Sequence, residues 1–241
     1  MKECWRWFGP ADPISLSDLP MVGVQGIVTA LHHIPPGAVW TPEEITKRQA
    51  LLSNAGYAWD VVESLPVSEA IKAQTSDMAD HIANYKTSLQ NLAAAGCQTI
   101  CYNFMPILDW TRTNLRALQP HGGAAMLFDL VDFAAFDIHV LGRPNAADDF
   151  NEETQSLAKA RFMGFDDAQR KTLTNTIVAG LPGANDTWTL DDVRDCLEAY
   201  KSVSRTDLRR HLIDFLSEVG PLAQDLGLRL CCRPDDPPFG L

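Results

Sequence analysis

Four short stretches of the sequence place ionisable side chains next to proline. They are LHHIP at 31–35, ESLP at 63–66, NFMPILDWTRT at 103–113 and RPDDPP at 233–238. Each stretch follows an apolar run that is typical of a β-strand, so each marks the carboxyl end of a strand. Proline restricts the backbone at positions where a ligand would be held. These stretches form the candidate site, although strand-to-helix loops are often polar and rich in proline for purely structural reasons.

His32 and His33 are adjacent in an extended segment. Successive side chains of extended backbone point to opposite sides, so only one of the two rings can face a site. An imidazole there could bind a metal or a sugar-acid oxygen, or transfer a proton. A structural hydrogen bond is the competing interpretation. Glu63 could coordinate a hard cation or accept hydrogen bonds from hydroxyl groups, or it could form a salt bridge with a neighbouring loop.

The stretch 103–113 carries the densest set of polar groups. Asn103, Asp109, Trp110 and Arg112 supply an amide, a carboxylate, an aromatic face and a guanidinium. Arginine binds a carboxylate through two parallel hydrogen bonds. Because an acidic protein that holds an anion needs such a local cation, Arg112 is the candidate anchor for an anionic substrate. Alternatively, Trp110 and Arg112 only pack the loop.

Arg233 begins the last of the four stretches. Its guanidinium stays protonated and does not ligate a metal, so it could bind an anion or pair with Asp235 or Asp236. Two adjacent aspartates are a weak metal signal on their own. The sequence has no glycine-rich phosphate loop, no G-x-S-x-G elbow and no C-x-x-C pair. The set of catalytic residues is therefore incomplete for most reactions.

Composition and charge exclude several classes of partner. The net charge of −11 over 241 residues disfavours nucleic acid and anionic membrane surfaces, because phosphate groups would be repelled. No apolar run approaches the roughly 18 residues that a membrane span requires. The N-terminus MKECWRWFGP lacks the apolar core of a signal peptide. We therefore interpret the six cysteines as reduced thiols and expect a cytoplasmic location.

Apolar runs and apolar spacing predict alternating strands and helices. A Thr41–Glu44 capping box and Gly56 delimit a helix over 42–55. Apolar residues that step by three and four predict a helix near 78–92 and another near 208–226. Such alternation over short links indicates a parallel sheet. Strands are predicted at 23–31, 57–64, 97–104 and 228–232.

Residues 105–205 are mostly helical in pattern and are predicted to be an insertion between the third and fourth strands. The fold is then either a small open α/β sheet or half of an eight-stranded barrel, with residues 1–241 as a single partial (β/α) domain. The insertion and the missing phosphate loop argue against an independent flavodoxin-like domain. An open half-barrel leaves a strand edge unpaired, so the chain is expected to aggregate, to form a homodimer through that edge, or to need a complementing second polypeptide.

Several stretches together resemble the mannonate dehydratases, from residue 4 to the end of the chain. They are WRWFGPADPISL, GIVTALHHIPPGAVW, VVESLPV, CYNFMPILDWTRT, FAAFDIHVL, IVAGLPGA and RPDDPPFGL. The resemblance implies a xylose-isomerase-like TIM barrel, present here as an incomplete N-terminal half with about four parallel strands. It also implies a lyase that converts D-mannonate to 2-keto-3-deoxy-D-gluconate in hexuronate (glucuronate) catabolism, with Mn²⁺ or Fe²⁺.

The resemblance also gives an expected site. No catalytic residue is expected within the chain, because the family's catalytic histidine and tyrosine lie further along its longer members. Metal binding by this chain is not expected either, since the family motif is HPDDPP and Arg233 stands where its ligand histidine would be. The expected substrate-binding residues are His32, His33, Glu63, Asn103, Asp109, Trp110 and Arg112.

Two functional hypotheses follow. In the first, the chain is a mannonate dehydratase-type lyase that is inactive alone because most of the catalytic and metal-binding residues are missing. In the second, it is a non-catalytic piece, or pseudoenzyme, that binds the sugar acid without the metal.

Overall fold

The computed structural model describes residues 1–108, 111–178 and 188–234. The chain forms two compact units. The first contains Met1–Phe104 and Tyr200–Pro234, and the second contains the described residues between 105 and 199.

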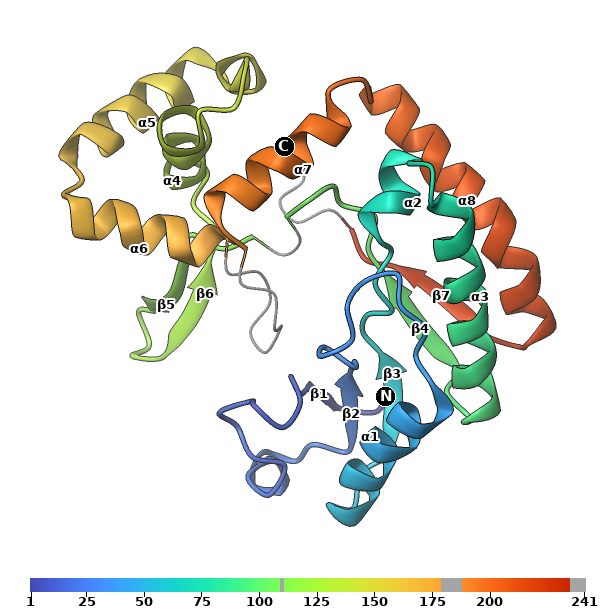
Figure 1. The fold of residues 1–241 in the computed structure, drawn as a ribbon. Helices are drawn as coiled ribbons and strands as arrows, with labels where there is room; N and C mark the ends of the chain where they lie inside the picture. Colours follow the sequence, from blue (N-terminus) through green and yellow to red (C-terminus); the bar gives the residue numbers. More distant parts are fainter. Residues whose placement is uncertain (109–110, 179–187, 235–241) are drawn as a thin grey trace. The chain divides into compact units, whose positions relative to one another are not determined.

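The first unit is built on a parallel five-stranded sheet (Figure 1). The four predicted strands are confirmed, and so is the α/β class. The shortest strand, at the N-terminus, was not predicted. In their order across the sheet, the strands are β1 (Cys4–Arg6), β2 (Gly26–Thr29), β3 (Trp59–Val62), β4 (Thr99–Tyr102) and β7 (Arg229–Cys232).

The three helices predicted in the first unit are present, with ends within a few residues of the predicted ones. In α1 (Pro42–Asn54), the Thr41 hydroxyl accepts a hydrogen bond from the Glu44 N–H, and Gly56 has a φ of +82°. The predicted capping box is only half formed, because the carboxylate of Glu44 binds His33 and Lys47 instead of the Thr41 N–H. The other helical elements are η1 (Leu19–Val22), α2 (Glu69–Ala73), α3 (Met78–Ala94) and α8 (Arg205–Asp225).

The core of this unit lies between the sheet and α1, α3 and α8, which follow the same side of the strands (Figure 1). Phe215 of α8 is buried at its centre. Its ring centroid lies 5.1 Å from that of Tyr85 on α3 and 5.8 Å from that of Tyr102 on β4. These contacts confirm the apolar stripes predicted for both helices. Pro221 lies inside α8.

The second unit combines helices with a hairpin that the sequence pattern did not predict. Strands β5 (Asn114–Leu118) and β6 (Ala124–Leu127) pair antiparallel. Within the unit, the buried carboxylate of Asp137 receives bonds from the Nε and Nη2 atoms of Arg143 at 3.0 and 2.8 Å. The remaining elements are α4 (Leu130–Ala135), a π-helix η2 (Phe136–Leu141), η3 (Ala146–Asp149), α5 (Glu152–Gly164), α6 (Asp167–Val178) and α7 (Leu190–Tyr200).

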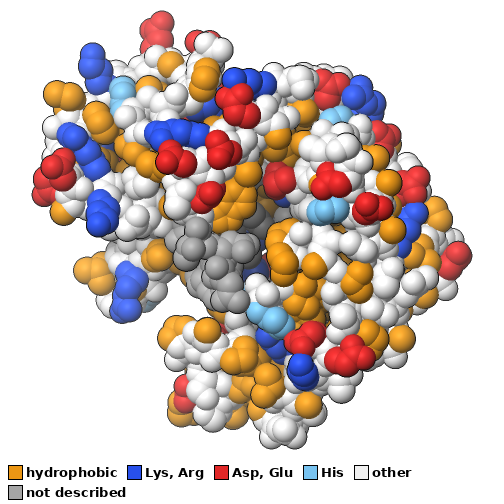
Figure 2. Space-filling view, in the orientation of Figure 1, with side chains coloured by type: hydrophobic (Ala, Val, Ile, Leu, Met, Phe, Trp, Pro, Cys, Tyr) orange, Lys and Arg blue, Asp and Glu red, His pale blue; other side chains and the backbone are white. Residues whose placement is uncertain are grey.

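On the face of each unit seen in Figure 2, acidic and basic side chains are interspersed rather than gathered by sign. In the part of the chain that the structure describes, no helix is both long and apolar enough to cross a membrane.

Candidate functional site

The carboxyl ends of the parallel strands meet at one edge of the sheet, and backbone hydrogen bonds extend their alignment beyond the strands. The Trp7 N–H donates to the Val28 carbonyl at 2.9 Å, and the Glu63 N–H donates to the Thr29 carbonyl at 2.9 Å. The Arg233 N–H donates to the Tyr102 carbonyl at 3.0 Å. Functional groups of parallel α/β sheets gather at this edge. The residues that follow the strands are therefore held in register with one another.

Arg6, at the end of β1, forms an ion pair with Glu63 at the end of β3. The Nη1 atom of Arg6 lies 2.6 Å from the Oε1 atom of Glu63, and their side chains are 16% and 21% exposed. The guanidinium also lies 5.0 Å from the ring centroid of Phe8. Glu63 therefore has a cationic partner at the strand ends, in β1 rather than in the neighbouring loop that the salt-bridge interpretation named. Sequence reasoning missed Arg6, because a three-residue strand leaves no periodic signal.

His32 is mostly buried beside these residues. Its ring centroid lies 6.0 Å from that of Phe8. The pKa of His32 is lowered to about 4, mainly by burial and to a smaller extent by the charges of Arg6, Arg48 and His33. The backbone of Phe8 raises this pKa slightly but does not offset the other causes. Among the described residues, neither buried ring nitrogen has a hydrogen-bond partner. At neutral pH the ring is uncharged, so one nitrogen can donate and the other can accept.

His33 lies on the surface and away from this cluster. Its Nε2 atom lies 2.9 Å from the Oε2 atom of Glu44 on α1, and its side chain is 44% exposed. The two neighbouring histidines thus make different contacts, as an extended backbone requires.

Asn103 follows β4 and is buried. Its Nδ2 atom donates to the Ser64 hydroxyl at 3.3 Å, which links the ends of β3 and β4. Arg112 belongs to the second unit, where its Nη1 atom donates to the Thr111 carbonyl at 2.7 Å. Asp109 and Trp110 lie outside the described residues. The structure thus brings together His32, Glu63 and Asn103 of the predicted set.

A metal centre is not formed by the described residues. Among them, no group of three or more histidine, cysteine, aspartate or glutamate side chains could hold a metal ion. Cys101 faces Cys231 across β4 and β7. Burial, more than the nearby Glu63 and Cys231, raises the pKa of Cys101 to about 11. This thiol therefore stays protonated at neutral pH.

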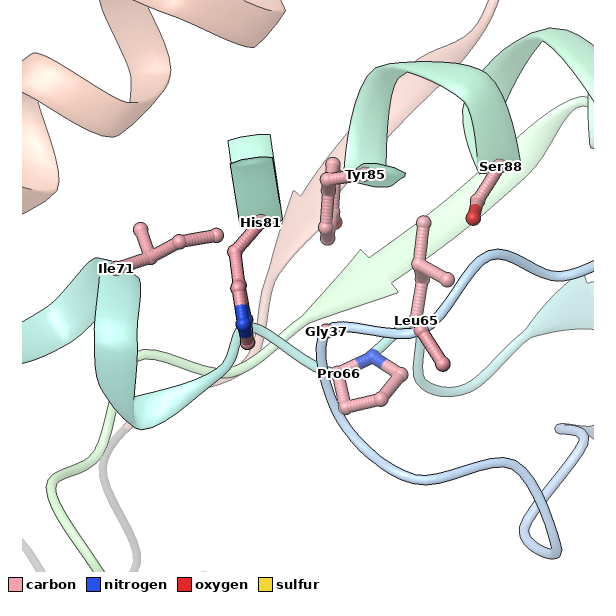
Figure 3. A pocket seen from close by; sticks show the side chains of 8 residues that line it. Gly37, Leu65, Pro66, Ile71, His81, Tyr85 and Ser88 are labelled. Carbon is pink, nitrogen blue, oxygen red and sulfur yellow. The ribbon is translucent and has the colours of Figure 1, made fainter. Parts of the chain in front are cut away.

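A small cavity lies behind the strand ends, between α3 and the loops after β2 and β3 (Figure 3). His81 and Tyr85 of α3 line it, and the His81 Nδ1 atom lies 2.7 Å from the Ser68 hydroxyl. The buried Tyr85 hydroxyl has no hydrogen-bond partner in the described part of the chain. The cavity measures about 10 Å³, which is room for about one water molecule and far too little for a sugar.

Comparisons with known proteins agree on one family. The family model for D-mannonate dehydratase (UxuA) matches residues 1–241. Mannonate dehydratase of Rhizobium meliloti is 51% identical and mannonate dehydratase 1 of Agrobacterium fabrum is 50% identical, each over 241 residues and all of this chain. The chain spans 60% of the length of both relatives.

A solved structure shows the same fold. The crystal structure of mannonate dehydratase from Streptococcus suis serotype2 matches with a TM-score of 0.70 at 30% identity. The match covers 100% of this chain and 54% of that chain.

Proposed function

The chain belongs to the D-mannonate dehydratase family, and from that premise we propose that its strand ends bind a six-carbon sugar acid where the acid loses water. The family match over residues 1–241 carries the proposal. The cluster of Arg6, His32, Glu63 and Asn103 at neighbouring strand ends supports it, because a polyhydroxy acid needs both a cation and several hydrogen-bonding groups.

The proposed reaction converts D-mannonate into 2-keto-3-deoxy-D-gluconate and water, a step in bacterial hexuronate catabolism. A base removes the proton from the carbon next to the carboxylate. The hydroxyl on the following carbon then leaves as water after it takes up a proton, and the enol that remains becomes the ketone. The reaction therefore requires an acid, a base and stabilisation of developing negative charge.

We assign binding roles to the residues of this chain. Neutral His32 donates or accepts a hydrogen bond at a substrate oxygen, Glu63 accepts from hydroxyl groups, and Asn103 orients a hydroxyl or carboxylate oxygen. Arg112 is proposed to pair with the substrate carboxylate. His33, Asp109 and Trp110 complete the set proposed from the resemblance, with His33 the weakest member because Glu44 already holds it.

The family implies Mn²⁺ or Fe²⁺, which would polarise substrate oxygens. The described residues do not fit such an ion by themselves, and Arg233 stands where the resemblance places a histidine ligand. We therefore assign no step of the reaction to a metal held by this chain. A xylose-isomerase-like TIM barrel with residues 105–205 as an insertion is our proposal for the architecture, and a cytoplasmic location stays a prediction.

Calorimetric titration of the purified chain tests the binding role. We expect D-mannonate to bind about tenfold more tightly than its neutral match D-mannitol, because a hydrogen bond to a charged group contributes roughly 1.5–3 kcal/mol. Equal affinity for the acid and the polyol would contradict the proposal. We also expect EDTA to leave mannonate binding unchanged, since the described residues lack a metal-ligand cluster.

A second candidate function is sugar-acid binding without catalysis. Arg233 favours it, because this residue stands where the resemblance places a histidine that would bind the metal. Both candidates share the binding site, so an activity assay separates them. We propose that residues 1–241 alone with Mn²⁺ or Fe²⁺ form no keto-deoxy acid from D-mannonate. The lyase function then requires that activity appears when the part of a relative beyond the matched region is supplied, whereas the binding function predicts none.

A further inference from the structure

We propose that Arg48 of α1 is a positioning residue of this site, a buried guanidinium that fixes the ends of β1 and β2 and thereby holds Arg6 and His32. The inference rests on the proposed function only for the identity of the ligand. The contacts themselves concern this chain and are testable without any substrate.

Arg48 first holds the end of β2. Its side chain comes from a helix, yet only 4% of the residue is exposed. The Nη1 atom donates to the Thr29 hydroxyl at 2.9 Å and to the Ala30 carbonyl at 2.7 Å. Thr29 is the last residue of β2, and Ala30 lies two residues before His32. The guanidinium therefore fixes the backbone that presents the histidine.

Arg48 also holds the segment after β1. Its guanidinium carbon lies 5.3 Å from the ring centroid of Trp7, the residue next to Arg6. Gly9 has a φ of +97°, and a Cβ atom there would lie 3.1 Å from the Nη2 atom of Arg48. The backbone after β1 thus bends around the guanidinium at a glycine, which adopts this conformation without steric cost. One side chain links the two strand ends.

The charge of Arg48 has no direct ion-pair partner among the described residues, although the charge of Glu44 acts on it from a distance. In the described part of the chain, no carboxylate forms an ion pair with it, and Glu44 on the same helix binds His33 and Lys47 instead. Burial lowers the pKa of Arg48 to about 10, so it remains protonated at neutral pH. A buried unpaired cation is costly to stability. A buried cation beside His32, in a chain of net charge −11, suits a site that binds an anion.

A purely structural anchor would make the same contacts, so the test needs a measurement beyond stability. We propose ¹⁵N-histidine NMR of the ligand-free chain across pH, with a His32→Gln sample to identify the His32 signals. Arg48→Met removes the charge and the hydrogen bonds, and Arg48→Lys keeps the charge but loses the planar guanidinium. Gly9→Ala places a methyl group against the Nη2 atom of Arg48 and so displaces the guanidinium without changing its charge.

The controls match each change. Gly56→Ala introduces a methyl group at another left-handed glycine, with a φ of +82° and no atom within 4 Å. Arg209→Met removes an exposed arginine from α8 of the same unit.

We expect Arg48→Met to raise the titration midpoint of His32 by about 0.5–1 pH unit, since it removes a nearby like charge. Arg48→Lys should keep the midpoint but move the ring signals, and Gly9→Ala should move them too. Both controls should match wild type. Unchanged His32 signals in Arg48→Met and Gly9→Ala would overturn the proposal. If Arg48→Met does not fold, Arg48→Lys and Gly9→Ala decide by the same criterion.

A separate titration addresses the ligand. We expect Arg48→Met to weaken D-mannonate binding about threefold to tenfold and to leave D-mannitol binding unchanged, because only the acid responds to the lost charge. Equal weakening of both ligands would overturn the electrostatic part of the inference. If wild-type protein does not prefer D-mannonate, the proposed function fails, while the NMR experiment still decides the role of Arg48.

Discussion

At the scale of single residues, side chains at the carboxyl end of a predicted strand could be located from sequence. His32, Glu63 and Asn103 were selected because strand ends meet at one edge, and the structure places all three at the ends of β2, β3 and β4. Their roles remain proposals. The partners that determine their chemistry were not predictable, since Arg6 and Arg48 come from a three-residue strand and from a helix. Only tertiary packing brings these cations to the histidine.

The Arg6–Glu63 pair gives a first prediction. We expect Glu63→Gln to lower the free energy of unfolding by about 1 kcal/mol, because it leaves a half-buried guanidinium without its carboxylate. Glu218→Gln breaks a more exposed pair with Lys86 and serves as the matched control, with an expected cost of about 0.3 kcal/mol. Urea denaturation of both variants makes the comparison. Equal losses would show that partial burial adds nothing to the Arg6–Glu63 pair.

The lowered pKa of His32 gives a pH dependence. Below the unfolded pKa of 6.5, the unfolded chain takes up a proton that the folded chain refuses until about pH 4. This group's contribution to stability is therefore complete above pH 6.5 and is lost as pH falls toward 4, by up to about 3 kcal/mol. We expect urea unfolding at several pH values to show a shallower dependence in His32→Gln than in wild type. Parallel curves would contradict a neutral buried His32.

At the scale of secondary-structure elements, an element can be predicted from apolar periodicity only where one of its faces is buried. Helices α3 and α8 press one face against the sheet, so their apolar residues recur every three or four positions and both were predicted. Strands β5 and β6 are exposed along nearly their whole length, with a burial pattern that does not alternate. Without a covered face there is no period of two, and the hairpin was missed.

The loop after β2 offers a test of packing between elements. Gly37 has a φ of +88°, and a Cβ atom there would lie 2.1 Å from the His81 Nδ1 atom on α3. The Asn84 Nδ2 atom also donates to the Gly37 carbonyl at 2.9 Å. We expect Gly37→Ala to destabilise the chain by about 1–2 kcal/mol more than Gly56→Ala, which has the same backbone cost without the contact. Thermal or urea denaturation measures the difference, and equal costs would exclude tight packing here.

At the scale of the whole molecule, alternating strands and helices were enough to predict a parallel α/β sheet, and five parallel strands confirm it. The division into two units was not predictable, because it depends on contacts between residues far apart in sequence. Arg112, the predicted carboxylate-binding arginine, belongs to the second unit, and its role stays a proposal. The cations found beside the first unit's strand ends are Arg6 and Arg48.

The last prediction concerns Arg233 and is tested in a hybrid protein that is longer than this chain. In a hybrid that supplies the part of the Rhizobium meliloti relative beyond the matched region, we expect Arg233→His to raise Mn²⁺-dependent dehydration of D-mannonate at least about tenfold. The physical reason is that an arginine repels a divalent cation, whereas a neutral imidazole offers it a lone pair. Arg229→His, at the start of the same strand, is the control and should have no effect. Formation of the keto-deoxy acid is the measurement. Equal activity of the unmodified and Arg233→His hybrids would show that Arg233 does not occupy a metal-ligand position.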